Sequence, residues 1–125
     1  MEAIITELCN DKVCINTGIG NIKGIWCSDS PAKLKKYDLE LDSNEIINSN
    51  MINYSSLLKP VVEMDNDRVI FNGLVEEIQD KVLFLRLSKD IVMLEISDKS
   101  YFLKFVNQFV RIVLSNIELY DTGLI

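Results

Sequence analysis

The strongest constraint on the fold of this chain is its excess of β-branched residues. Isoleucine and valine together make up 26 of the 125 residues, whereas alanine occurs only twice. Side chains branched at Cβ are stiff at χ1 and pack better on a pleated strand than on a helix. Turn-forming residues separate the apolar runs about every eight to twelve positions, a spacing typical of small barrels and sandwiches. We therefore predict an all-β protein with at most two short helices.

Alternation of apolar and polar residues places the individual strands. The expected strands cover residues 4–8, 13–15, 22–27, 37–42, 61–64, 69–78, 81–87, 91–96 and 110–120. For the last of them, an interruption near residues 115–116 is left open. Residues 43–56 are rich in Asn and Ser and are interpreted as a linker or long loop, and residues 101–108 suit a short helix as well as a strand. Strand parity predicts six buried residues in the second half: Leu83, Leu85, Val92, Leu94, Ile112 and Leu114.

The two halves of the chain resemble each other. Residues 4–8 align with residues 74–78 at an offset of seventy, and after one deletion residues 11–13 align with 80–82 at sixty-nine. Chance similarity between β-rich segments is the alternative, because strands share composition. We expect an N-terminal β-rich half, 1–56, and a C-terminal half, 57–125, as two units or as one compact unit.

The segment Gly73-Leu74-Val75-Glu76-Glu77-Ile78-Gln79-Asp80-Lys81-Val82 opens a long strand, a turn and a second strand. With the strands that follow, residues 69–120 resemble an OB-type barrel, in which a glycine inside the first strand lets that strand coil. The resemblance implies one small barrel or two tandem OB-like barrels. It implies a binding scaffold, and it names no ligand.

The charge of the chain favours a basic partner. Nineteen acidic against thirteen basic residues give a net charge of −6, and both halves are acidic. Such a field repels phosphate backbones and anionic lipid, and it attracts basic proteins. In size and charge the chain resembles the immunity proteins that neutralise bacterial toxin domains in the cytoplasm. That resemblance implies a small binding protein that inhibits a basic protein, and it transfers no site residue.

An acidic row on the strand at 37–42 is the first candidate for binding such a partner. Asp38, Glu40 and Asp42 alternate with apolar residues, so that period two places all three on one face, and Glu45 lies just beyond them. The alternative is a solvated face that keeps a strand edge from aggregating. A long strand edge can also pair with a second copy, so a homodimer stays open.

A basic and aromatic segment carries the alternative function. Lys33, Lys35 and Lys36 form the only dense basic patch, and Trp26 precedes them by seven residues. Stacking and phosphate contacts of this kind bind single-stranded nucleic acid in OB-type domains, which also bind oligosaccharides. The negative field of the chain makes nucleic acid the less favoured partner.

The sequence offers no catalytic or cofactor chemistry. Histidine is absent, which removes imidazole bases, and no motif supports an enzyme. The three cysteines, Cys9, Cys14 and Cys27, form no CxxC pair and lack a fourth ligand, so we expect free thiols and no metal. The longest apolar runs span four residues, far short of a membrane helix, and no apolar signal segment follows Met1. We expect a cytoplasmic protein without a cofactor.

Overall fold

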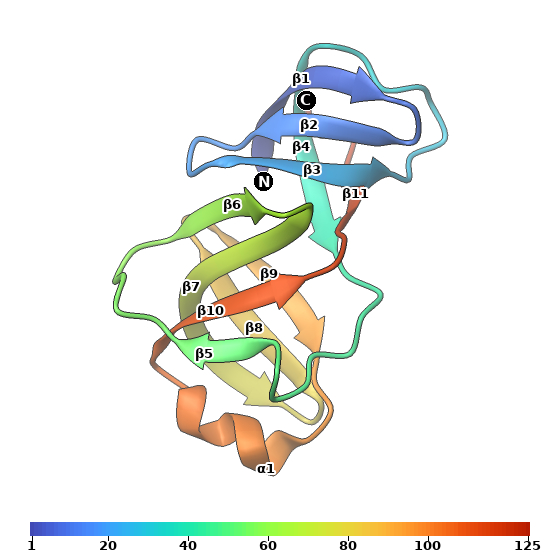
Figure 1. Ribbon diagram of the computed structural model, residues 1–125. Coiled ribbons are helices and arrows are strands. Elements are labelled where there is room, and N and C mark those ends of the chain that lie inside the picture. Colours follow the sequence, from blue (N-terminus) through green and yellow to red (C-terminus); the bar gives the residue numbers. More distant parts are fainter.

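Strands account for nearly all the regular structure of the protein. The computed structural model describes residues 1–125 (Figure 1). Its elements are β1 (Glu2–Cys9), β2 (Lys12–Asn16), β3 (Asn21–Trp26), β4 (Lys36–Asp42), β5 (Ile52–Tyr54), β6 (Val61–Asp65), β7 (Arg68–Gln79), β8 (Val82–Leu87), β9 (Asp90–Glu95), α1 (Lys99–Phe102), a 3₁₀ turn (Leu103–Phe105), β10 (Phe109–Leu114) and β11 (Glu118–Asp121). The all-β prediction is confirmed. The ambiguous segment 101–108 is helical over its first five residues, 101–105, and contains no strand.

A closed five-stranded barrel forms from the N-terminal strands and one strand from the C-terminal end. β1, β2 and β3 make an antiparallel meander, and β4 returns beside β1. β11 lies between β3 and β4, parallel to the first and antiparallel to the second, which gives the order β1-β2-β3-β11-β4. This architecture is compatible with an OB-type barrel. The likeness was expected in residues 69–120, whereas the closed barrel contains the other half of the chain.

The second sheet has six strands, and four of them repeat the arrangement of β1 to β4, a three-stranded meander with a fourth strand beside the first. β7, β8 and β9 form a meander, α1 and the 3₁₀ turn connect it to β10, and β10 returns antiparallel to β7. β5 pairs with β10, and β6 pairs with β7. One apolar cluster of 28 buried residues includes members of both sheets, so they share a core. All six residues that strand parity placed in the core are buried.

The internal repeat is visible in the strand pairing. β1 and β7 each carry a bulge in the same place, between Ile5 and Glu7 and between Val75 and Glu77. The turn that follows each strand begins with a residue at positive φ, Asn10 or Asp80. The offset remains seventy beyond the turn, because Val13 pairs with Leu8 just as Leu83 pairs with Ile78. The expected one-residue deletion at this point is therefore wrong.

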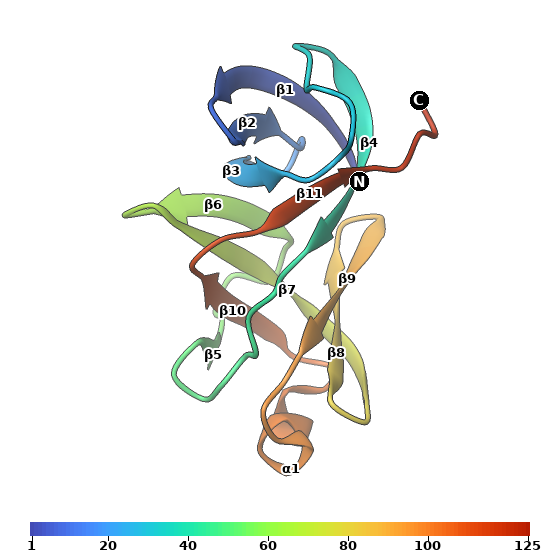
Figure 2. The same ribbon diagram turned by 90° about the vertical axis from the view of Figure 1, so that its right-hand side faces the viewer.

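The two sheets exchange the strands that complete them. After β4 the chain leaves the barrel, bridges the end of β9 in parallel at Ile47 and Ile96, and continues into β5 beside β10. After β10 the chain leaves the second sheet and enters the barrel as β11 (Figure 2). The two crossing segments accept corresponding backbone hydrogen bonds at the ends of β3 and β9. Cys27 N donates to Leu119 O, and Ser97 N donates to Ile47 O, both over 2.9 Å. The segment 43–56 is thus more than a linker. The strand expected at 110–120 is interrupted after Leu114, where the sequence left a break open, and its two parts belong to different sheets.

A close backbone contact joins the two sheets at Gly20. Val62 N on β6 donates to Ile19 O in the loop between β2 and β3, over 3.1 Å. Gly20 has φ +147°, and a Cβ atom there would lie 1.7 Å from Val62 O. Only glycine has room at this position. A backbone hydrogen bond therefore adds to the shared core in holding the sheets together.

We expect Leu94→Ala on β9 to lower the free energy of unfolding by about 2–5 kcal/mol, because Leu94 is 1% exposed and its loss leaves a cavity. The neighbouring Met93 is 55% exposed, and Met93→Ala is the matched control, with an expected change within about 0.5 kcal/mol. Urea unfolding measures both. Equal stability of the two variants would contradict the assigned strand parity.

We expect fragments 1–56 and 57–125 to assemble into a 1:1 complex when they are co-expressed, because each carries the segment that completes the other's sheet. The cut falls in an exposed connection, where Leu58 is 72% exposed, and Asn72 Nδ2 still donates to Leu57 O and Lys59 O within the second fragment. Co-purification and size-exclusion chromatography measure assembly. A second fragment truncated after residue 117 lacks β11 and should assemble weakly. Two fragments that fold separately without association would contradict the exchange.

Candidate functional site

The acidic row predicted on β4 lies on the outer face of the barrel. Tyr37, Leu39 and Leu41 are buried, and the carboxylates alternate with them. Glu40 and Asp42 are exposed, whereas Asp38 and Glu45 are half-buried. The predicted alternation is therefore present. The four candidate acids nevertheless differ in what they contact.

Asp38 is engaged inside the molecule. Thr122 Oγ1 donates to its Oδ2 over 2.7 Å, and the N-terminal ammonium donates to its Oδ1 over 3.1 Å. These two hydrogen bonds hold the pKa of Asp38 below its ordinary value, the Thr122 bond contributing most. The same ammonium lies 3.3 Å from Asp90 Oδ1 on β9, so this ion cluster joins the barrel to the second sheet.

Glu45 also has a structural partner. Its Oε2 accepts hydrogen bonds from the backbone N–H groups of Ser115, over 2.8 Å, and Asn116, over 3.3 Å. These two residues form the crossing between β10 and β11. Glu45 itself lies in the opposite crossing, between β4 and β5. One carboxylate therefore links the two exchanged connections, and it is not free to bind a partner.

The remaining acids are joined by residues of β11 that the sequence did not single out. Glu118 stands directly opposite Asp42, and Tyr120 stands directly opposite Glu40. We call Glu40, Asp42, Glu118 and Tyr120 the acidic face. Sequence reasoning missed Glu118 and Tyr120 although they alternate with buried Ile117 and Leu119, because nothing local shows that β11 lies beside β4.

The acidic face has no internal cation. None of the carboxylates of Glu40, Asp42 and Glu118 forms an ion pair. Like charges directly opposite on neighbouring strands are destabilising, and Asp42 and Glu118 form such a pair. Loss of hydration, with the nearby Cys27, Glu118 and Asp42, raises the pKa of Tyr120.

Trp26, the aromatic residue of the alternative nucleic-acid face, is held by neighbours within the barrel. Its Nε1–H donates to Ser30 O over 2.8 Å. Its ring packs edge-on against Tyr37, with 5.1 Å between the centroids. Trp26 is half-buried and packs against the core cluster. A stacking platform requires a free ring face, and part of this ring is used for packing.

The three lysines of that face have different neighbours. Lys35 Nζ lies 4.8 Å from the centre of the Tyr37 ring, and Lys33 N donates to the Tyr37 hydroxyl over 3.1 Å. Lys36 Nζ lies 3.4 Å from Glu2 Oε2. The structure therefore places Trp26 and the Lys35 ammonium against the same tyrosine ring, whereas the Lys36 ammonium is paired with Glu2.

An open cleft of about 440 Å³ lies between the β2–β3 loop and the β8–β9 turn. Its walls are mainly polar and include Asp38, Asp90 and Lys89. The two carboxylates already bind the N-terminal ammonium. Few of the lining residues are hydrophobic, and the cleft is open, whereas small-molecule sites are usually enclosed and lined by apolar side chains.

No protein-family model, curated protein or solved structure matches this chain. The protein contains no helix with the length and apolar character needed to cross a membrane. The geometry of the chain itself is thus the basis for any functional assignment.

We expect Asp38→Asn to lower the free energy of unfolding at neutral pH by about 1 kcal/mol, a value reduced for the 21% exposure of the side chain. The folded-state pKa of Asp38 is depressed, so its contribution is complete above the unfolded pKa, roughly 3.9, and is lost as pH falls through the folded value. The difference between wild type and variant should therefore shrink in acid. Urea unfolding across this pH range measures it, with Glu40→Gln as the control. A difference independent of pH would contradict the assignment.

Proposed function

We propose that this protein binds a basic segment of a partner protein through the acidic face. The observation that carries the proposal is the pair formed by Asp42 and Glu118, two carboxylates directly opposite each other without a cation. Such a pair costs stability in the free protein. A lysine or arginine of a partner placed between the two relieves this repulsion on binding.

The rigidity of the acidic face supports the proposal. Its side chains stand on two hydrogen-bonded strands of a closed barrel, so that binding orders little backbone. Tyr120 adds an aromatic ring and a hydroxyl among the carboxylates, and tyrosine is a frequent anchor in protein interfaces. The net charge of −6 steers a basic partner towards the molecule from a distance.

The partner class that this chemistry favours is a basic protein domain that the chain inhibits by covering it. A toxin domain neutralised by an immunity protein is one example of such a pair, and the size and acidity of the chain support that reading. The alternative, binding of single-stranded nucleic acid or an oligosaccharide through Trp26 and the lysines, has weaker support. Both Trp26 and Lys36 have intramolecular partners, and the field of the chain opposes phosphate.

The test reverses two charges of the acidic face and leaves Asp38 and Glu45, which stabilise the fold, unchanged. We expect Glu40→Lys with Asp42→Lys to slow association with the partner about tenfold or more at low salt, and we expect added salt to reduce this difference. Asp38 is excluded from the reversal because it binds Thr122 and the N-terminus. The control reverses two exposed acids of β6, Glu63→Lys with Asp65→Lys, which changes the net charge equally.

Partner identification and kinetics form one experiment. Immobilised wild-type protein captures partners from cells that produce it, and the purified partner is then measured against both double variants. Slower association for the acidic-face variant alone supports the proposal. Equal slowing in both variants would mean that overall charge acts without a site. Retention of the wild type on a single-stranded oligonucleotide in moderate salt, lost on Lys33→Glu with Lys35→Glu, would instead establish the alternative.

A further inference from the structure

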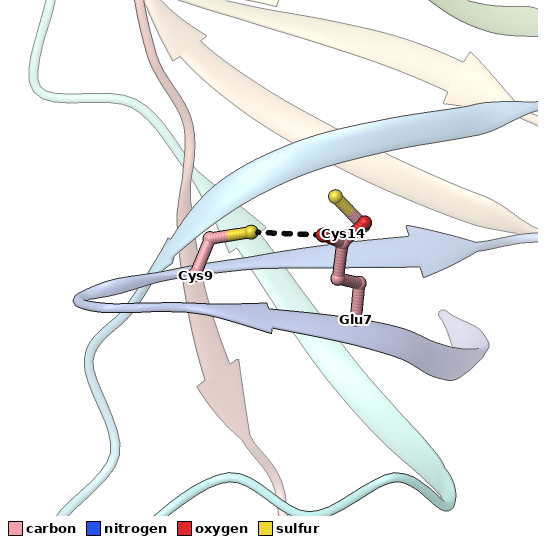
Figure 3. Close-up of side chains that lie close together, drawn as sticks. All are labelled: Glu7, Cys9 and Cys14. Atoms are coloured by element: carbon pink, nitrogen blue, oxygen red, sulfur yellow. Dashed lines mark hydrogen bonds between the residues drawn. The ribbon is translucent and has the colours of Figure 1, made fainter.

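Three potential metal ligands meet on the β1–β2 hairpin, away from the acidic face. Glu7 pairs directly with Cys14 across the two strands, and Cys9 follows Glu7 by two residues on β1. The carboxylate oxygen and the two sulfur atoms all lie within 4.8 Å of one another. Figure 3 shows the three side chains close together, with Cys9 Sγ joined to the Glu7 carboxylate by a hydrogen bond of 3.5 Å.

Strand geometry produces this convergence. Residues two apart on a strand share a face, which places Cys9 beside Glu7, and direct pairing places Cys14 beside Glu7 as well. Glu7 was not considered as a ligand in the sequence, because only the pairing across the hairpin places its carboxylate beside the two thiols. A hairpin within a closed barrel also presents the three donors with little freedom to lose on binding.

We propose that Glu7, Cys9 and Cys14 bind one Zn²⁺ ion, with water in the fourth position. Thiolate ligands select zinc over hard cations such as Mg²⁺ and Ca²⁺, and a carboxylate oxygen is an ordinary third ligand for zinc. Zinc–sulfur bonds of about 2.3 Å in a tetrahedral site place two sulfurs roughly 3.8 Å apart. The observed separations, none above 4.8 Å, reach that arrangement by small side-chain rotations.

The charges around the cluster are compatible with zinc binding. Each thiol that binds zinc as thiolate releases its proton to solvent, so two protons leave as one Zn²⁺ enters and the net charge of the site is unchanged. The neighbouring cations, Lys12 opposite Cys9 and Lys23 opposite Cys14, therefore do not oppose loading.

A disulfide is the competing use of the two cysteines, and the strand register disfavours it. Cys9 is paired with Lys12 and Cys14 with Glu7, so the two cysteines are diagonal neighbours. Diagonal pairs have Cα atoms roughly 7–8 Å apart, beyond the usual range for a disulfide. A metal ion spans this larger separation, because each sulfur binds the ion and not the other sulfur.

The test is titration of the reduced full-length protein with Zn²⁺, and with Co²⁺ as a spectroscopic probe. We expect one equivalent to bind, a sulfur-to-cobalt charge-transfer band to appear, and two thiols to be protected from alkylation. Cys9→Ser and Cys14→Ser should each weaken zinc binding at least about 100-fold, more than the loss of an outer-sphere partner usually does. Glu7→Gln should weaken it less and retain the cobalt band, because both sulfurs remain.

Cys27→Ser is the matched control, since Cys27 lies outside the cluster and contacts Glu118. It should bind zinc as the wild type does. Mass mapping after alkylation should identify Cys9 and Cys14 as the protected thiols. Absence of stoichiometric binding above neutral pH, binding that survives Cys9→Ser or Cys14→Ser, or a Cys9–Cys14 disulfide formed in air and unaffected by zinc would each overturn the proposal.

Discussion

The structure depends on hydrogen-bond partners for the edge strands of its two sheets. A four-stranded half of this chain would leave one edge of β3 and one edge of β4 without hydrogen-bond partners, and β11 provides both. The second sheet has the same need, which Ile47 and β5 meet. Unpaired backbone groups are costly when buried and invite aggregation when exposed. Reciprocal exchange closes the barrel and covers the edge of β10 and the end of β9 in the second sheet, and it makes each sheet depend on a segment of the other.

The exchange also creates the candidate site. Asp42 belongs to the first half of the chain and Glu118 to its C-terminal end, and they face each other only because β11 crosses into the barrel. The same crossings explain why Glu45 and Asp38 are unavailable to a partner. Glu45 accepts hydrogen bonds from the β10–β11 connection, and Asp38 accepts one from Thr122 just beyond β11. The four acids looked alike in the sequence, but the structure divides them. Asp38 and Glu45 stabilise the crossing segments, whereas Glu40 and Asp42 belong to the acidic face and have no ion-pair partner.

The two proposals concern different strand pairs of one barrel and are independent. The acidic face lies on β4 and β11, where long-range pairing gathers like charges. The proposed zinc ligands lie on β1 and β2, where a short hairpin gathers a carboxylate and two thiols. Variants at one location leave the ligands of the other in place. A zinc ion held on the hairpin would add rigidity to the barrel that presents the acidic face.

Local pattern in the sequence predicted most of the strands and the buried side of β8, β9 and β10, whereas β5 lies in a segment that was expected to be a linker or loop. Leu83, Leu85 and Leu94 were assigned to the core from alternation alone, since period two is a property of the strand itself. Alternation does not show which strands pair with each other. The sequence allowed a break near residues 115–116 in the strand expected at 110–120, but it did not show that Ile112 and Leu119, on either side of the break, belong to different sheets. Pairing between distant segments is selected by the edges that the rest of the fold leaves open, and only the tertiary structure contains that information.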